Sequence, residues 1–299
     1  MERVSFFDEI EKNNRRSILL AGLVFVVLVA LIYVIFDTLA PELSIFFLVF
    51  AVVFVGIYIY STYNYGDRIV LMTTGAKKVS ENDPKYVQLF NVVDGLSIAA
   101  GVPRPKVYVI ESNEMNAFAT GKDPEHASIA MTTGLLKNLK RDELEGVIGH
   151  EMSHIGNYDI RFAMLVAVMV GLIAILSDAL LRSWRFGSRR DERERGGAGL
   201  LILIGLVLAI VAPIIVRLVQ FAISRKREFL ADASSAKLTR YPEGLASALK
   251  KIKKINQGNM KVNEAVSHLF FVDPNRSPLD SLYATHPPIG ERIKILREM

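Results

Sequence analysis

Two histidines four residues apart flank a glutamate in the run 149–154, whose sequence is GHEMSH. On an α-helix this spacing places His150 and His154 on one face, one turn apart, where both imidazoles can bind the same metal ion. Glu151 lies about 100° further round the helix, close to the metal but off the line of the two ligands. A carboxylate there can take a proton from a water molecule that the metal has acidified to a pKa of about 7. The run therefore indicates half of a catalytic zinc site.

The other half must come from elsewhere in the chain, because catalytic zinc usually has three protein ligands. The chain has no cysteine, so the missing ligand is a histidine or a carboxylate, and no disulfide is possible. Segment 224–233, SRKREFLADA, contains two candidates. Taken alone, it is equally well explained as a solvated charged run at a membrane boundary. Because the upstream site is incomplete, we expect Glu228 to be the third ligand and Asp232 to orient His150 or His154 through its second ring nitrogen.

A further candidate lies at residues 285–292, which read THPPIGER. His286 or Arg292 could stabilise the oxyanion that forms when water attacks a peptide carbonyl. A turn followed by a surface helix explains the same residues. His126 and His268 have no partner pattern, and we expect both to be structural.

The residues around the histidine run favour a helix. Apolar residues recur at helical spacing, and no proline interrupts 142–161. Asp142 and Glu145 resemble a capping box, which would start the helix at Asp142. We expect a second helix at 84–100, with Asp83 as its N-cap, and a basic surface helix at 241–257.

Three short strands are predicted before the histidine helix, at 106–110, 116–121 and 127–131, the last two joined by a turn around 122–124. A sheet edge beside a metalloprotease helix can accept an extended peptide as an extra strand. We therefore expect substrate to bind along Asn116, Ala117 and Phe118. The alternative is that this hairpin is only scaffold.

The composition predicts a soluble domain attached to a few membrane helices. Hydrophobic residues make up 51% of the 299 residues, and the mean hydropathy is +0.29. Residues 17–36 and 43–61 are long enough to span a bilayer, and we favour an anchor over a cleaved signal peptide for the first. Four basic residues precede the first span and none separates it from the second, which places the N-terminus and the chain after Gly66 in the cytoplasm.

Two further apolar runs, 162–181 and 198–223, surround an arginine-rich loop. If both runs span, this loop lies outside, against the positive-inside rule; alternatively they form a hairpin that dips into the membrane or packs on the domain. Basic residues cluster beside the apolar runs, so a lipid bilayer is the expected partner and nucleic acid is not.

Together these patterns divide the chain into four parts. The expected parts are a cytoplasmic stub with two transmembrane helices (1–66), a first catalytic part with the histidine helix (67–161), the third and fourth apolar helices (162–223), and a second catalytic part with the third ligand (224–299).

Four segments together resemble the HtpX family, integral-membrane zinc metalloproteases related to the CAAX prenyl endopeptidases. The matching segments are NAFATG at 116–121, HEMSH at 150–154 with Asn157 and Asp159 after it, SRKREFLAD at 224–232, and THPP at 285–288. The resemblance implies a mainly α fold with a small β-sheet, a membrane-anchored gluzincin-like metallopeptidase domain with about four transmembrane or membrane-associated helices. It also implies one zinc ion per subunit on His150, His154 and Glu228, with Glu151 as catalytic base and Asn157 supporting the ligands.

The expected function is that of a zinc endopeptidase. The resemblance implies a bacterial or archaeal plasma membrane, a cytoplasmic active site and the degradation of damaged membrane proteins. One alternative is a zinc-binding membrane sensor or scaffold without turnover, which would have a closed site with four protein ligands. Another is a protease for prenylated peptides.

Overall fold

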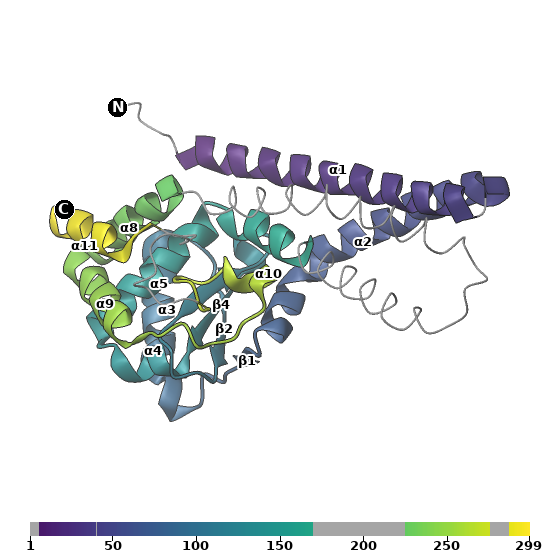
Figure 1. Ribbon diagram of the computed structural model, residues 1–299. Helices are drawn as coiled ribbons and strands as arrows, with labels where there is room; N and C mark the ends of the chain where they lie inside the picture. The colour runs from purple at the N-terminus through teal and green to yellow at the C-terminus, as the bar shows by residue number, and fades with distance from the viewer. Residues whose placement is uncertain (1–5, 40, 170–224, 276–286) are drawn as a thin grey trace.

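The computed structural model describes residues 6–39, 41–169, 225–275 and 287–299. Two long helices, α1 (Phe6–Leu39) and α2 (Ser44–Thr73), are joined by the short helix η1 (Pro41–Leu43). They lie side by side and project from a body that contains the described strands (Figure 1). Both helices are long and apolar enough to cross a membrane.

Both helices extend further than the predicted spans. Helix α1 begins at Phe6 instead of residue 17, and α2 ends at Thr73 instead of residue 61. The extra turns of α2 are stabilised by packing, because Val70 and Leu71 are buried in a cluster that includes Phe118 of the body. The predicted boundary at residue 66 therefore falls within a continuous helix.

Of the third predicted apolar run, residues 162–169 are described and are helical. The rest of that run, the arginine-rich loop and the fourth run lie outside the described residues, so the expected count of about four membrane helices stays a prediction.

The body contains the predicted small sheet. Its strands lie in the order β1 (Lys77–Lys78), β2 (Lys106–Ile110), β4 (Ser128–Thr132), β3 (Ala117–Thr120). Strands β2 and β4 are parallel, whereas β3 pairs with β4 as an antiparallel hairpin through η3 (Pro124–His126). The three predicted strands are confirmed, and β3 lies at one edge of the sheet.

Helix α3 (Val87–Ala100) confirms the second predicted helix. It follows η2 (Pro84–Tyr86), where the predicted N-cap Asp83 accepts a hydrogen bond from the backbone of Lys85. A further short helix, α4 (Thr133–Asn138), was not predicted; the Thr132 side chain caps it by accepting from the Leu135 backbone.

The histidine helix is α5 (Arg141–Gly156), and its predicted start was wrong. Lys140 takes the N-cap position, and its backbone N–H donates to the Glu143 side chain at 2.7 Å. Lys251 and Ser247 of the next layer also hydrogen-bond to Glu143, so tertiary contacts select this carboxylate over those of Asp142 and Glu145.

Helix α5 is the centre of the body and is surrounded by α3, β3, α8 (Arg225–Thr239) and α9 (Pro242–Ile255). The chain continues through α10 (Glu264–Ser267) to α11 (Ile289–Arg297), which packs on α9. The expectation that 241–257 is surface structure was half right. Helix α9 exposes most of its lysines but buries Leu245, Leu249 and Ile252 in the core, because its apolar residues recur at helical spacing.

Two glycines let α8 and α9 approach α5 closely. A Cβ at Gly146 would lie 2.6 Å from the backbone nitrogen of Leu245, and one at Gly149 would lie 2.9 Å from Ser235 Oγ. The Ser235 hydroxyl occupies the space where a side chain at Gly149 would lie, and it donates a hydrogen bond to the Gly146 carbonyl at 2.6 Å.

We expect Gly146→Ala to destabilise the protein by about 1–3 kcal/mol. The new methyl group would clash with the backbone of Leu245, which can move only if helix α9 moves with it. Thermal unfolding of the detergent-solubilised protein measures the effect. Gly95→Ala is the matched control: it also lies inside a helix, but a Cβ there has no neighbour within 4 Å. An unfolding temperature for Gly146→Ala equal to that of Gly95→Ala would contradict the close contact between α5 and α9.

Candidate metal centre

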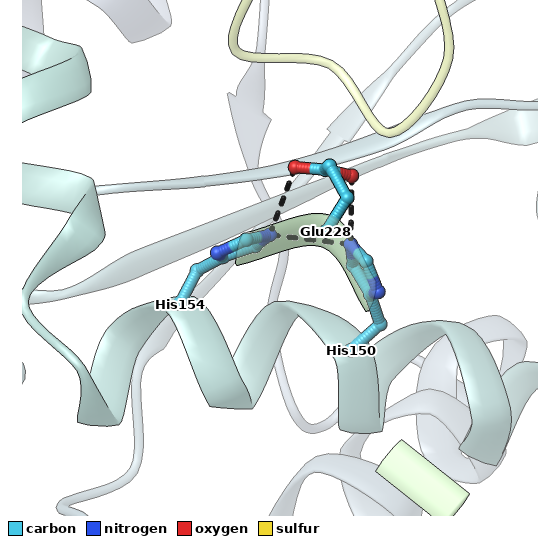
Figure 2. Close-up of side chains that lie close together, drawn as sticks. All are labelled: His150, His154 and Glu228. Atoms are coloured by element: carbon cyan, nitrogen blue, oxygen red, sulfur yellow. Dashed lines mark hydrogen bonds and ion pairs between the residues drawn. The ribbon is translucent and has the colours of Figure 1, made fainter. Parts of the chain in front are cut away.

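The structure brings together three of the predicted site residues, His150, His154 and Glu228 (Figure 2). Helix α5 presents its two histidines with the Nε2 atoms 3.2 Å apart. Glu228 reaches them from α8, with Oε2 3.6 Å from His150 Nε2 and Oε1 3.7 Å from His154 Nε2. Ligands about 2.1 Å from a tetrahedral zinc ion lie about 3.4 Å from one another, so these spacings fit one zinc ion.

The other ring nitrogen of each histidine faces a carboxylate. His150 Nδ1 lies 2.9 Å from Asp232 Oδ1, and His154 Nδ1 lies 2.9 Å from Asp159 Oδ2. A carboxylate accepts hydrogen bonds, so these partners assign the ring proton to Nδ1 and leave the lone pair on Nε2. Two lone pairs that face each other beside a third oxygen donor repel unless a cation lies among them. The donor chemistry therefore fits a metal ion.

The charges around the site also favour a cation. Burial by itself lowers the pKa of His154, but the carboxylates of Asp159, Glu228 and Glu151 outweigh it and raise that pKa to about 9. Burial is also the largest cause of the raised pKa of Glu151, and it outweighs the opposing effect of the two histidines. A positive charge held between these groups relieves the repulsion among them.

Glu151 shares a cavity of about 50 Å³ with the three candidate ligands. Its side chain is buried, and the backbone of Ala119 on β3 hydrogen-bonds to it. The carboxylate therefore lies beside the metal donors, where sequence spacing predicts a general base. The cavity can hold an ion and a few water molecules.

Asp232 is itself held by Arg292 of α11. The guanidinium donates from Nε to Asp232 Oδ2 at 2.8 Å and from Nη2 to Oδ1 at 2.7 Å, a two-pronged ion pair. Burial by itself raises the pKa of Asp232, but Arg292 and His150 outweigh it and hold that pKa below its usual value. The Arg292 guanidinium is fully buried and bound to Asp232, and its predicted oxyanion role stays a prediction. His286, the other candidate, lies outside the described residues.

Asp159 belongs to a segment that resembles the HtpX family, but the sequence alone predicted no role for it. Helix α5 ends at Gly156, Tyr158 adopts a left-handed conformation with φ of 60°, and the next helix begins at Asp159. The turn at Tyr158 brings the Asp159 carboxylate next to His154. Asn157, predicted to support the ligands, instead lies at the end of α5 and donates to Ser153 Oγ at 3.3 Å. The sequence signal that could have indicated this role is an acidic residue five positions after His154.

The predicted substrate-binding residues contact the chain's own residues 270–272. Asn116 exchanges side-chain hydrogen bonds with the Val272 backbone, and the Ala117 carbonyl accepts from Phe271 at 2.8 Å. The Phe118 ring packs against Phe270, with centroids 4.9 Å apart. The expectation of a free edge at Asn116, Ala117 and Phe118 is therefore corrected, because an intramolecular segment already occupies it. Ala119, next along β3, does line the cavity.

His126 and His268 agree with a structural role. His126 is exposed and hydrogen-bonds to Asp123, whereas His268 is buried with Nε2 3.1 Å from the Ala163 carbonyl. His268 also lines the cavity.

Comparison with known proteins places these observations in a family. The sequence model of the family described as "Peptidase family M48" matches residues 85–299. A protein named "Protease HtpX homolog" from Dictyoglomus thermophilum is 44% identical over all of this chain and 96% of its own length. One of the same name from Thermoanaerobacter pseudethanolicus is 46% identical over 84% of each chain.

Among solved structures, the crystal structure of S. mikatae Ste24p superposes with a TM-score of 0.51 at 20% sequence identity, covering 97% of this chain and 67% of the other. At that identity the likeness concerns the fold. It agrees with the predicted mainly α architecture, and the family match agrees with the resemblance drawn from the four motifs.

We expect Asp232→Asn to weaken zinc binding by about 10- to 100-fold, because His150 loses the carboxylate that fixes its ring. Competition with a chromophoric chelator measures the affinity. The control is Glu243→Gln, which also removes a carboxylate bound to an arginine of α11, Arg297, but at the exposed surface. Equal zinc affinities of the two variants would show that Asp232 does not orient His150.

Proposed function

This chain belongs to peptidase family M48 and is a membrane-bound metalloprotease; on that premise we propose that its metal is zinc and that it degrades misfolded or damaged membrane proteins. We propose His150, His154 and Glu228 as the zinc ligands. The observation that carries this proposal is the convergence of two Nε2 atoms and one carboxylate on a single point, with both Nδ1 atoms bound to carboxylates.

The number of donors favours catalysis over a structural metal. Within the described residues, the group that could hold a metal consists of these three side chains. A structural zinc site normally has four protein ligands, whereas a catalytic site keeps one position for water or substrate. The donor count therefore supports a protease over a zinc-binding sensor or scaffold.

Zinc, when bound, supplies the Lewis acidity that activates water and polarises the scissile carbonyl. The chain's own residues do the rest. Glu151 takes the proton from the attacking water and passes it to the amine that leaves. Asp232 and Asp159 hold the two imidazoles in place during this exchange.

Substrate must enter beside Ala119. The edge of β3 before it is occupied by residues 270–272, whereas Ala119 lines the cavity and contacts Glu151. An extended peptide that pairs with the backbone there would lie next to the proposed base.

The arrangement of the membrane helices supports a cytoplasmic active site. Helices α1 and α2 form a hairpin, so the start of α1 and the end of α2 both lie at the body (Figure 1). Basic residues precede α1's apolar stretch and are absent from the hairpin connection. We propose that the body faces the cytoplasm of a bacterium or archaeon, below its plasma membrane.

Glu151→Gln should lower cleavage of casein by at least about 10²-fold while zinc stays bound, because only the proton acceptor is lost. Zinc content and casein cleavage of the purified protein are the two measurements. Glu145→Gln, on the same helix but in an exposed pair with Arg141, is the control and should cleave normally. Retained cleavage by Glu151→Gln would remove this residue from the mechanism.

The substrate class is tested separately with matched prenylated and unprenylated peptides and with a destabilised membrane protein. We expect the destabilised protein to be cleaved and prenylation to change the rate of peptide cleavage by less than about twofold, since a substituent that gains no contact in the transition state does not change the rate. Strict dependence on the prenyl group would favour the alternative.

A further inference from the structure

Asn13, at the start of α1, is a buried polar residue that neither membrane anchoring nor the proposed chemistry requires. It is 1% exposed, although its neighbours Arg15 and Ile18 on the same helix are open to solvent or lipid. A buried amide is costly unless each of its groups has a hydrogen-bond partner. Its partners therefore indicate what it does.

All of these partners belong to the two segments that form the metal centre. Asn13 Nδ2 donates to Asp159 Oδ1 at 2.7 Å and to the Asn157 carbonyl at 3.0 Å. Its Oδ1 accepts from Arg227 Nη1 at 3.2 Å. Asn157 and Asp159 directly follow the histidine helix, and Arg227 directly precedes Glu228. One amide thus joins the end of α5 to the start of α8.

The carboxylate of Asp159 divides its oxygens between two tasks. Oδ2 holds His154 Nδ1 at 2.9 Å, whereas Oδ1 is held by Asn13 and, at 3.3 Å, by Arg227. A carboxylate fixed at one oxygen cannot rotate about its bond to Cβ, so Oδ2 stays directed at the imidazole. Asn13 therefore acts on His154 through Asp159.

We propose that Asn13 is a positioning residue of the metal centre, so that docking of the first membrane helix completes the site. The inference rests on the proposed assignment of His150, His154 and Glu228 as zinc ligands. It means that the anchor does more than tether the enzyme: the helix that enters the bilayer also supplies a hydrogen bond that fixes the ring of a ligand.

The competing explanation is that Asn13 only fastens α1 to the body. Asn14 provides the comparison, because it fastens the same turn of α1 without reaching Asp159. Its Oδ1 accepts from Arg161 Nη1 at 2.6 Å. Both residues therefore dock α1, but only Asn13 contacts the carboxylate behind His154.

The test compares Asn13→Ala, Asn13→Leu and Asn14→Ala in the whole protein in lipid nanodiscs. Zinc affinity is measured by chelator competition, and cleavage of casein is measured with limiting and with saturating zinc. We expect both Asn13 variants to bind zinc about tenfold more weakly, which is the smaller effect seen when a residue that hydrogen-bonds behind a metal ligand is removed. Asn14→Ala should differ from the natural protein by less than about twofold in zinc affinity. Saturating zinc should restore most of the cleavage by the Asn13 variants.

Asn13→Leu keeps about the same side-chain volume and adds no charge while removing the donor to Asp159. It replaces Asn13→Ala in the comparison if Asn13→Ala unfolds. Zinc affinity of a folded Asn13 variant equal to that of Asn14→Ala overturns the proposal and leaves Asn13 as a fastener. Failure of the natural protein itself to bind zinc would instead refute the metal assignment, so the two failures are distinguishable.

Discussion

Each histidine of the metal centre is held by a carboxylate, and each carboxylate is held by an arginine. The two series are His150, Asp232 and Arg292 on one side and His154, Asp159 and Arg227 on the other. In both series the buried carboxylate therefore lies against a guanidinium of opposite charge. The arginines come from α8, which packs on α5, and from α11, which packs on α9 and α8. The polar centre and the surrounding helices therefore depend on each other.

Backbone packing sets how far Glu228 must reach. Gly146 and Gly149 lack side chains on the face of α5 that meets α9 and α8, and Ser235 fits into the space at Gly149. Helix α8 therefore runs close enough for a glutamate side chain to meet both imidazoles. Larger residues on this face would move α8 outward and separate the third donor from the other two. The glycines of α5 are in this sense part of the metal centre.

Local periodicity was sufficient to predict much of the site. The four-residue spacing of the histidines and of Glu228 and Asp232 fixes their faces once each segment is helical, and the structure brings these side chains together. Asp159, Arg227 and Asn13 were not predicted, because their contacts depend on the left-handed turn at Tyr158 and on a helix far away in sequence. Local patterns also could not predict what covers the edge of the sheet. The sequence identifies β3 as a strand, but it does not show that residues 270–272 lie against it.

The order of these pieces along the chain has a consequence during synthesis. A ribosome makes the two histidines first, then more than fifty apolar and basic residues, then Glu228, and Arg292 later still. A nascent chain with the histidine helix already folded has two of three metal donors, and Asp232 lacks its counter-charge until α11 emerges. The candidate group of three donors is therefore complete only after translation has passed Glu228. For a membrane-bound metalloprotease, this order places the completion of the candidate metal-binding group late in synthesis.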